Sequence, residues 1–212
     1  MNEDILAYAS VLQLSRADMN ILKIKDAYAL HKVVYGLFED IRSDVEKQAS
    51  APSGIVYADK GGDFNTRQIL MLSNRKPHQT PQFGEVQTKT IQSSFLAHER
   101  YAFEVTLNPG KRDKQTGKIV PIRGRQPIEQ WFMERAPKSW GFRVNPENLQ
   151  TEKISVQVFH KAGKDITHGS ATLKGELLVI DRDLFSQSFS QGIGRGRAFG
   201  FGLLQIVPLT AS

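Results

Sequence analysis

Hydrophobic and polar positions divide the first part of the chain into a strand and a helix. Apolar residues dominate 4–14, which predicts a first strand, and residues 15–20 are expected to form a loop. Asp26 is a candidate N-cap, because its short carboxylate can accept the unpaired N–H groups of a helix start. The helix that follows should turn one apolar face to a core, formed by Ala27, Leu30, Val34, Leu37 and Ile41.

The pattern changes after the break at 51–54. Residues 54–59 and 67–73 are predicted strands joined by a hairpin connection at 60–63. The polar segment 75–92 is expected to be poor in strand, and a weakly patterned helix is expected within 90–99. A clear strand at 100–108 follows, with Tyr101, Phe103, Val105 and Leu107 alternating. This order of elements fits a ferredoxin-like unit, which we assign to an N-terminal domain of residues 1–108.

The second half repeats this order of elements without repeating the sequence. A short strand, a helix with Pro127 in its first turn, two long strands, a second helix and a final strand are expected. A C-terminal ferredoxin-like domain of residues 109–212 follows, so the fold class is α+β with tandem ferredoxin-like (double RRM-like) domains. The expected ranges are 118–123, 127–134, 154–160, 168–180, 181–190 and 202–209, with a loop beginning at 141–144.

Composition narrows the classes of partner and site. The net charge of +6 and pI near 9.5 suit a polyanionic partner without specifying one. The absence of cysteine excludes disulfides and thiolate-ligated metals. No segment approaches the roughly 18 apolar residues of a membrane span, so we expect a cytoplasmic protein without a membrane partner.

The segment Gly192–Gly202 is the most informative part of the sequence, because it holds five glycines interleaved with two arginines and two phenylalanines. It matches neither the dinucleotide-binding nor the Walker A pattern. Its exposed backbone N–H groups, with the two arginine side chains, can bind phosphates. The alternative is a flexible turn with solvated arginines, and the interleaving favours phosphate binding. The candidate residues are Gly192, Gly194, Arg195, Gly196 and Arg197.

Tyr28 and His31 lie three residues apart and therefore on one helix face, in a stripe that continues to Tyr35 and Phe38. Imidazole can gain or lose a proton near neutral pH. Cleavage of RNA by its own 2′-OH needs one group to remove a proton and another to protonate the 5′-oxygen, and such help is worth roughly 100- to 10,000-fold in rate. Taken alone, the pair fits a histidine at the boundary of a helix core at least as well.

A basic run begins after 109–110. Six positive charges and one opposing carboxylate occupy a predicted strand–loop–strand connection, which suits the grooves of an RNA stem as well as it suits a solvated hairpin tip. The remaining histidines show no metal-ligand spacing, so neither a metal nor a cofactor is expected. The candidate RNA-binding residues of this run are Lys111, Arg112, Lys114, Arg123 and Arg125, with Lys118 beside them.

Motifs spread over nearly the whole chain resemble the CasE branch of the CRISPR repeat-RNA endoribonucleases, the subunits that mature crRNA in Cascade complexes. The glycine-rich segment is the most specific of these motifs. The others are the helix segment Tyr28–Phe38, the strand Phe103–Pro109, Gln130-Trp131-Phe132 and Gly141–Val144.

The resemblance implies a double ferredoxin-like fold and metal-independent cleavage at the 3′ base of a repeat stem-loop. Attack by the 2′-OH would leave a 5′-hydroxyl and a 2′,3′-cyclic phosphate or 3′-phosphate. It also implies that the protein stays bound to the crRNA 3′ hairpin in a prokaryotic cytoplasm, beside other Cascade subunits such as the backbone protein. His31 falls on the family's catalytic histidine, Tyr28 on the accompanying tyrosine, and the glycine-rich segment on the RNA-contacting loop. Arg197 stands where the family often has lysine.

Two other functions fit the basic segments. One is a catalytically inactive subunit that caps an RNA hairpin in a larger complex. The other is a general RNA-binding protein, whose affinity would fall steeply with salt and depend little on sequence.

Overall fold

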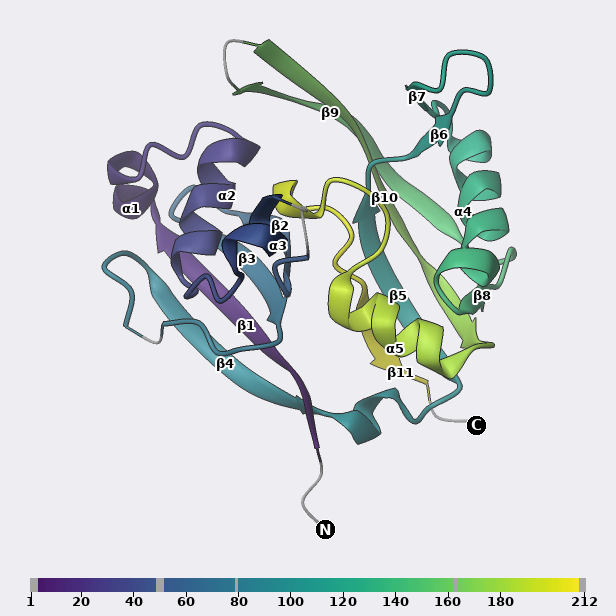
Figure 1. The fold of residues 1–212 in the computed structure, drawn as a ribbon, viewed down its shortest axis with the longest axis horizontal. Coiled ribbons are helices and arrows are strands. Elements are labelled where there is room, and N and C mark those ends of the chain that lie inside the picture. The colour runs from purple at the N-terminus through teal and green to yellow at the C-terminus, as the bar shows by residue number, and fades with distance from the viewer. Residues whose placement is uncertain (1–3, 49–51, 79, 162–163, 210–212) are drawn as a thin grey trace.

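The computed structural model describes residues 4–48, 52–78, 80–161 and 164–209. Its first sheet has four antiparallel strands in the order β2–β3–β1–β4 (Figure 1). β1 (Ile5–Ser15) pairs with β3 (Thr66–Ser73) on one side and with β4 (Glu85–Gln92) on the other. β2 (Ile55–Gly62) forms the edge beyond β3. This is the strand order of a ferredoxin-like unit, as the sequence predicted.

The hairpin between β2 and β3 is confirmed, but its connection is shorter and later than predicted. β2 continues to Gly62, so only Asp63–Asn65 turns the chain. The Asp63 carboxylate accepts the N–H groups of Asn65 and Thr66 at 2.7 and 2.8 Å, which fixes this turn.

Three helices lie between β1 and β2 in the sequence: α1 (Arg16–Ile21), α2 (Ala27–Gly36) and α3 (Asp44–Gln48). The prediction of a loop at 15–20 is wrong. The Ser15 hydroxyl accepts the Asp18 N–H while the Asp18 carboxylate accepts the Ser15 N–H, and this capping box starts α1.

α2 begins as predicted, with the Asp26 carboxylate accepting the Ala29 N–H at 2.8 Å. Leu30, Val34 and Leu37 are buried against the first sheet. Ile41 is 61% exposed, because the helix ends at Gly36 and the helical spacing no longer applies beyond it.

β4 contradicts the expectation that 75–92 is poor in strand. Val86 and Ile91 are the only apolar residues among its eight, because β4 is an edge strand whose backbone pairs with β1 while most side chains face solvent. The helix expected within 90–99 is only a 3₁₀ turn at Ser93–Leu96.

The second sheet follows the order β11–β5–β10–β8, with β9 also paired to β10. β5 (Arg100–Leu107) lies between β11 (Gln205–Pro208) and β10 (Lys164–Val179). The division at 108/109 put this strand in the first half, but its hydrogen bonds place it in the second sheet, so sheet membership changes before Arg100. β5, from the N-terminal half of the chain, is therefore the pairing partner of β11, the last strand.

Two strands share one edge of β10. β8 (Phe142–Val144) pairs with the C-terminal end of β10, and β9 (Gln150–Lys161) pairs with the rest. The loop predicted to begin at 141–144 is therefore wrong, and β8 and β9 together fill one strand position. The second sheet thereby has the ferredoxin-like order as well.

The remaining elements of the second half agree with the sequence in type. α4 (Arg125–Ser139) starts before Pro127 and runs past the predicted end at 134. α5 (Arg182–Gln191) matches its prediction, and β6 (Gly110–Arg112) and β7 (Ile119–Pro121) form a small hairpin. Among the described residues, no helix is long and apolar enough to cross a membrane.

The molecule has two hydrophobic cores, and one of them joins the two sheets. One fills the space between α2 and the face of the first sheet that carries Leu12 and Met71. The other joins α4, α5 and the second sheet to the opposite face of the first sheet, which carries Val56 and Leu72. The first sheet is therefore covered on both faces, and this explains why Ile55–Ala58 is buried without alternation.

Candidate active site and RNA-binding surface

The glycine-rich segment, Gly192–Gly202, connects α5 to β11 and reaches toward α2 (Figure 1). Its two ends are hydrogen-bonded together, from the Ile193 N–H to the Gly202 carbonyl at 2.8 Å. The Gly202 N–H donates to the Thr106 carbonyl of β5 at 2.8 Å. All five glycines have positive φ, a conformation that other residues rarely adopt. The segment is therefore a fixed loop, held in shape by its glycines.

Tyr57 of β2 holds the middle of this loop. Its hydroxyl donates to the Ala198 carbonyl at 3.0 Å, and its ring packs beneath Gly200. Burial raises the pKa of the Tyr57 phenol, so the group stays protonated and remains a donor at neutral pH. The first sheet thereby fixes the position of a loop that belongs to the second half of the chain.

Phe199 lies in the loop between two histidines from different halves. Its ring centroid is 5.9 Å from that of His31 on α2 and 5.5 Å from that of His168 on β10. His31 also lies 4.1 Å from Tyr35 and 6.3 Å from Tyr28, centroid to centroid. The predicted Tyr28–His31 pair is thus half-buried at the contact between α2 and the glycine-rich loop.

His168 was not among the residues selected from the sequence. Burial, and then the charge of Arg195, lower the pKa of His168, which favours a neutral imidazole at neutral pH. A signal was available, because His168, Ser170 and Thr172 alternate with buried Ala171 and Leu173 along β10. A row of polar residues that alternates with apolar ones along a strand indicates a functional surface or a solvated one.

Lys32 is a second residue that the motif search missed. It follows Tyr28 by one helical turn, and its ammonium lies 4.7 Å from the centroid of the Tyr28 ring. The Tyr-x-x-His pair therefore carries a cation beside the tyrosine.

The two loop arginines have different surroundings. Arg195 is exposed and lines a cavity of about 680 Å³, and Arg123 and His168 line the same cavity. Arg197 donates to the Gln191 carbonyl at 2.9 Å and so braces the end of α5. The structure thus brings Arg195 together with the basic run, whereas Arg197 contacts its own loop.

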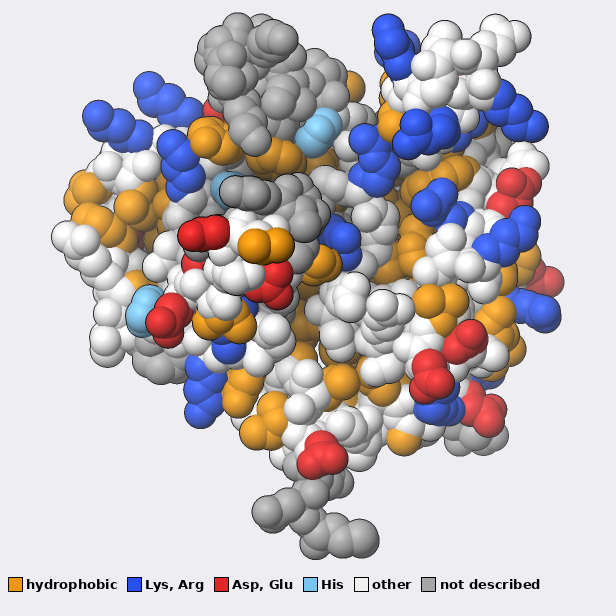
Figure 2. Space-filling model, in the orientation of Figure 1, with side chains coloured by type: hydrophobic (Ala, Val, Ile, Leu, Met, Phe, Trp, Pro, Cys, Tyr) orange, Lys and Arg blue, Asp and Glu red, His pale blue; other side chains and the backbone are white. Residues whose placement is uncertain are grey.

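The basic run forms an exposed hairpin. Lys111, Arg112 and Lys114 are exposed, and Arg112 donates to the Gly117 carbonyl at 2.7 Å. The one opposing carboxylate, Asp113, accepts the N–H and the hydroxyl of Thr116 within the turn, and these hydrogen bonds lower its pKa. Figure 2 shows Lys and Arg side chains gathered over β6, β7 and the start of α4, where Arg125 begins the helix.

A second cavity of about 500 Å³ lies between the two sheets, and it extends from the Arg123–Arg195 cavity to α2. Ser155, Val156 and Ser170 line both this inter-sheet cavity and the Arg123–Arg195 cavity. At its other end it is lined by Ala27 of α2 and by Phe199. The candidate RNA-binding residues and the candidate catalytic helix therefore lie along one hollowed surface.

The described residues contain no cluster of three or more His, Asp or Glu side chains that could hold a metal ion. The carboxylates of Asp26 and Asp59 line this surface, and imidazole, phenol, ammonium and guanidinium groups lie on it or beside it. These latter groups can transfer protons and bind phosphate oxygens.

Comparison with known proteins identifies relatives of this chain. It is 29% identical over 120 residues to the CRISPR-associated endoribonuclease Cse3 of Thermus thermophilus, covering 52% of this chain and 56% of that protein. It is 23% identical over 195 residues to the CRISPR system Cascade subunit CasE of Escherichia coli, covering 87% of this chain and 94% of that protein.

A solved structure has the same fold. The structure of Thermus thermophilus Cse3 bound to an RNA representing a pre-cleavage complex has a TM-score of 0.75 and 18% identity, covering 95% of this chain and 99% of that one. The fold class predicted from the sequence, α+β with tandem ferredoxin-like sheets, is thereby confirmed. A family model described as CRISPR associated protein matches residues 7–208, and the chain belongs to that family of CRISPR-associated proteins.

Proposed function

We propose that this protein is an endoribonuclease that cuts CRISPR precursor RNA at the 3′ base of the repeat stem-loop. It retains the crRNA hairpin as a subunit of a Cascade complex in a prokaryotic cytoplasm, beside the backbone protein. Support comes from the two relatives named for these roles and from the family match over nearly the whole chain.

The observation that carries the proposal is the hollowed surface that joins the exposed basic hairpin to α2. In this arrangement the hairpin residues Lys111, Arg112 and Lys114 contact the phosphates of the RNA stem. Arg123, Arg125 and Arg195 hold the strand that leaves the stem, and the glycine-rich loop presents its backbone N–H groups. The scissile phosphate then lies at the contact between α2 and Phe199.

His31 moves one of the two protons of the reaction. The 2′-oxygen attacks the adjacent phosphorus while its proton passes to a base, and the bond to the 5′-oxygen breaks as that oxygen receives a proton. Tyr28 assists by positioning the phosphate, and Lys32 beside it offsets the developing negative charge. The products are a 5′-hydroxyl and a 2′,3′-cyclic phosphate or its hydrolysed 3′-phosphate, and no metal takes part.

A single-atom change in the RNA tests this chemistry. Repeat RNA from the associated CRISPR array is compared with the same RNA carrying 2′-deoxyribose at the nucleotide before the cut. We expect the natural RNA to be cut once, leaving a 5′-hydroxyl on the downstream fragment, and the deoxy RNA to bind equally well and stay intact. Cleavage of the deoxy RNA at the same position would exclude attack by the 2′-OH.

The alternative is a hairpin-binding subunit without catalysis, which the basic segments alone would allow. It predicts that both RNAs bind tightly and that neither is cut. A protein that binds RNA without hairpin specificity is distinguished by equal affinity for the repeat and for an unrelated RNA of the same length at physiological salt.

A further inference from the structure

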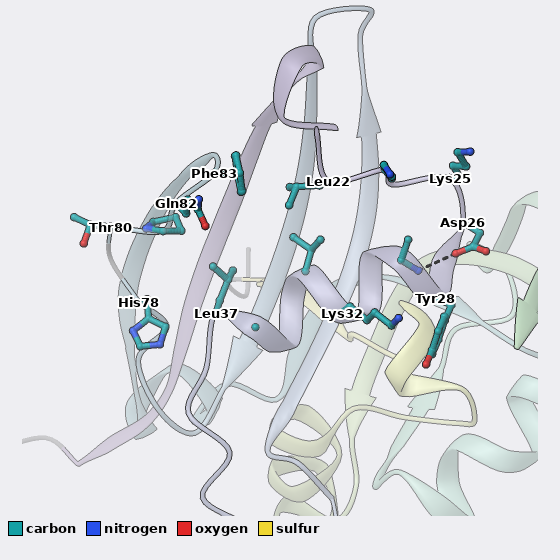
Figure 3. Close-up of a pocket in the computed structure, with 15 residues that line it drawn as sticks. Leu22, Lys25, Asp26, Tyr28, Lys32, Leu37, His78, Thr80, Gln82 and Phe83 are labelled. Carbon is teal, nitrogen blue, oxygen red and sulfur yellow. Dashed lines mark hydrogen bonds between the residues drawn. The ribbon is translucent and has the colours of Figure 1, made fainter. Parts of the chain in front are cut away.

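A third cavity lies on the other side of α2 from the glycine-rich loop (Figure 3). It has a volume of about 890 Å³ and runs between the outer face of α2 and the chain that leads into β4. We call it the α2 groove. Its lining includes Lys23 and Lys25 before the helix, Tyr28 and Lys32 on it, and Phe83 opposite.

The wall of the α2 groove opposite the helix is held in place at both ends. The His78 N–H donates to the Leu37 carbonyl at 2.8 Å, which ties the far wall to the end of α2. Gly84 packs so closely on β1 that a Cβ would lie 2.7 Å from the Gln13 carbonyl oxygen. Because these contacts are made by backbone, the groove is present before any ligand binds.

The chemistry of the α2 groove suits a single nucleic-acid strand. Lys23, Lys25 and Lys32 are exposed, and within the described part of the chain no salt bridge joins any of them to a carboxylate. The lining carboxylate, Asp26, accepts the Ala29 N–H as a helix cap. Phe83 and Tyr28 add aromatic faces, on which unpaired bases can stack.

The position of the α2 groove relates it to the candidate active site. Asp26 lines both the α2 groove and the inter-sheet cavity, so the start of α2 separates the two hollows. On the helix surface, Tyr28 and Lys32 lie between His31 and the residues that face the groove, Ala29 and Val33. A strand that passes His31 and Tyr28 and continues in the same direction therefore enters the groove.

We propose that the α2 groove binds the single-stranded RNA on the 3′ side of the cut. This inference rests on the proposed function, in which the stem occupies the β6–β7 side and the scissile phosphate lies at α2. Lys23 and Lys25 contact phosphates of the downstream strand, and Phe83 stacks on one of its bases. The groove thereby aligns the strand that leaves after cleavage.

The test measures binding to two RNAs that cannot be cut, each with 2′-deoxyribose before the scissile phosphate. One ends at the base of the stem, and the other carries a 3′ tail of about 12 uridines, within the site sizes of single-strand binding grooves. We expect the tail to raise affinity about tenfold, and Lys23→Gln/Lys25→Gln to remove that gain. The same variant should make the salt dependence shallower by about 1.4 in log–log slope, because each single-strand phosphate contact contributes about 0.7.

Two further variants separate charge from stacking. Phe83→Leu should lower the affinity for the tailed RNA about fivefold while leaving its salt slope unchanged, because stacking releases no counterions. The matched control is Lys89→Gln/Lys138→Gln, which removes two exposed lysines outside the α2 groove and should retain the full effect of the tail.

The outcomes distinguish this inference from the proposed function. Tight binding of both RNAs with equal affinity overturns the groove inference, and so does a tail effect that survives Lys23→Gln/Lys25→Gln. Failure to bind either RNA more tightly than an unrelated hairpin contradicts the proposed function itself.

Discussion

Phe199 contacts two histidines that lie far apart in the sequence, and only one of them belongs to a local motif. His31 belongs to a local motif, since a spacing of three places it beside Tyr28 on any helix. His168 reaches the same site because β10 and the glycine-rich loop meet in the folded chain. Contacts of this kind depend on tertiary structure, so spacing within one element cannot reveal them. The roles of both histidines stay predictions until they are tested.

His168 should make stability depend on pH. Burial and Arg195 hold the pKa of His168 below its ordinary value of about 6.5 in the folded protein, and the unfolded chain regains that ordinary value. Below about pH 6.5 the unfolded state therefore binds more protons than the folded state. The free energy of unfolding falls as the pH drops toward the pKa that His168 has in the folded protein. Above about pH 6.5 this contribution is fully present.

Urea unfolding of the wild type and His168→Asn measures this effect. We expect the wild type to lose more stability than the variant between about pH 7 and pH 5, above the range in which carboxylates titrate. The comparison uses the change with pH, because removing the imidazole ring alters stability at every pH. Equal losses in the two proteins would show that His168 titrates normally.

The substitution Tyr57→Phe tests how much the Tyr57 hydroxyl stabilises the glycine-rich loop. Tyr57→Phe removes the hydrogen bond to the Ala198 carbonyl and leaves the buried ring in place. The free energy of unfolding should fall by about 1 kcal/mol, as is typical for a lost buried hydrogen bond. Tyr8→Phe, at a half-exposed position, is the control and should change stability by less than about 0.5 kcal/mol. Equal losses of stability in Tyr57→Phe and Tyr8→Phe would mean that the Tyr57 hydroxyl contributes nothing to the stability of the fold.

At the scale of elements, strands and helices with a strong apolar pattern were predicted well. β5, α2 and α5 were found because their buried residues alternate or recur at helical spacing. β4 was missed because backbone pairing to β1, rather than apolar side chains, holds an edge strand. α1 was missed because its signal is the Ser15–Asp18 capping box and none of its residues is buried.

The glycine-rich loop is an element whose shape depends on specific positions. Gly202 has φ +84°, and a Cβ there would collide with the Ile193 carbonyl oxygen. Gly117 has a similar φ of +67° in the basic hairpin, with no atom within 4 Å of where its Cβ would stand. Gly117→Ala therefore has only the conformational cost of about 1–2 kcal/mol, and Gly202→Ala adds a steric clash to it.

Thermal unfolding of the two alanine variants separates these costs. We expect Gly202→Ala to lower the melting temperature clearly more than Gly117→Ala. The same variant should also weaken RNA cleavage, because the loop carries Phe199 to His31. If the two substitutions prove equally mild, the loop is more adaptable than its backbone geometry indicates.

At the scale of the whole molecule, the sequence predicted two ferredoxin-like units but not how they join. β5 was placed with the first half because it follows the earlier strands in sequence, and its partners β10 and β11 lie far downstream. The interface between the two units is made by long-range contacts, such as the salt bridge between Lys60 of β2 and Glu104 of β5. Tandem β-α-β units do not encode their mutual arrangement in local pattern, so the hollows between them could not be predicted.

The interface between the two units brings α2, the glycine-rich loop and the polar face of the second sheet around one surface. We propose that His31 performs proton transfer at this surface. It follows that cleavage and binding are separable, because the exposed basic hairpin is formed by β6 and β7 and not by α2.

The most direct test is cleavage of 5′-labelled repeat RNA by excess protein in EDTA, comparing the wild type, His31→Ala and His98→Ala. We expect one cut at the 3′ base of the stem by the wild type and by His98→Ala, because His98 is exposed and lies outside the site. His31→Ala should bind the RNA normally and cut it at least about 100-fold more slowly. Cleavage by His31→Ala at the wild-type rate would show that His31 transfers no proton and that other residues carry the chemistry.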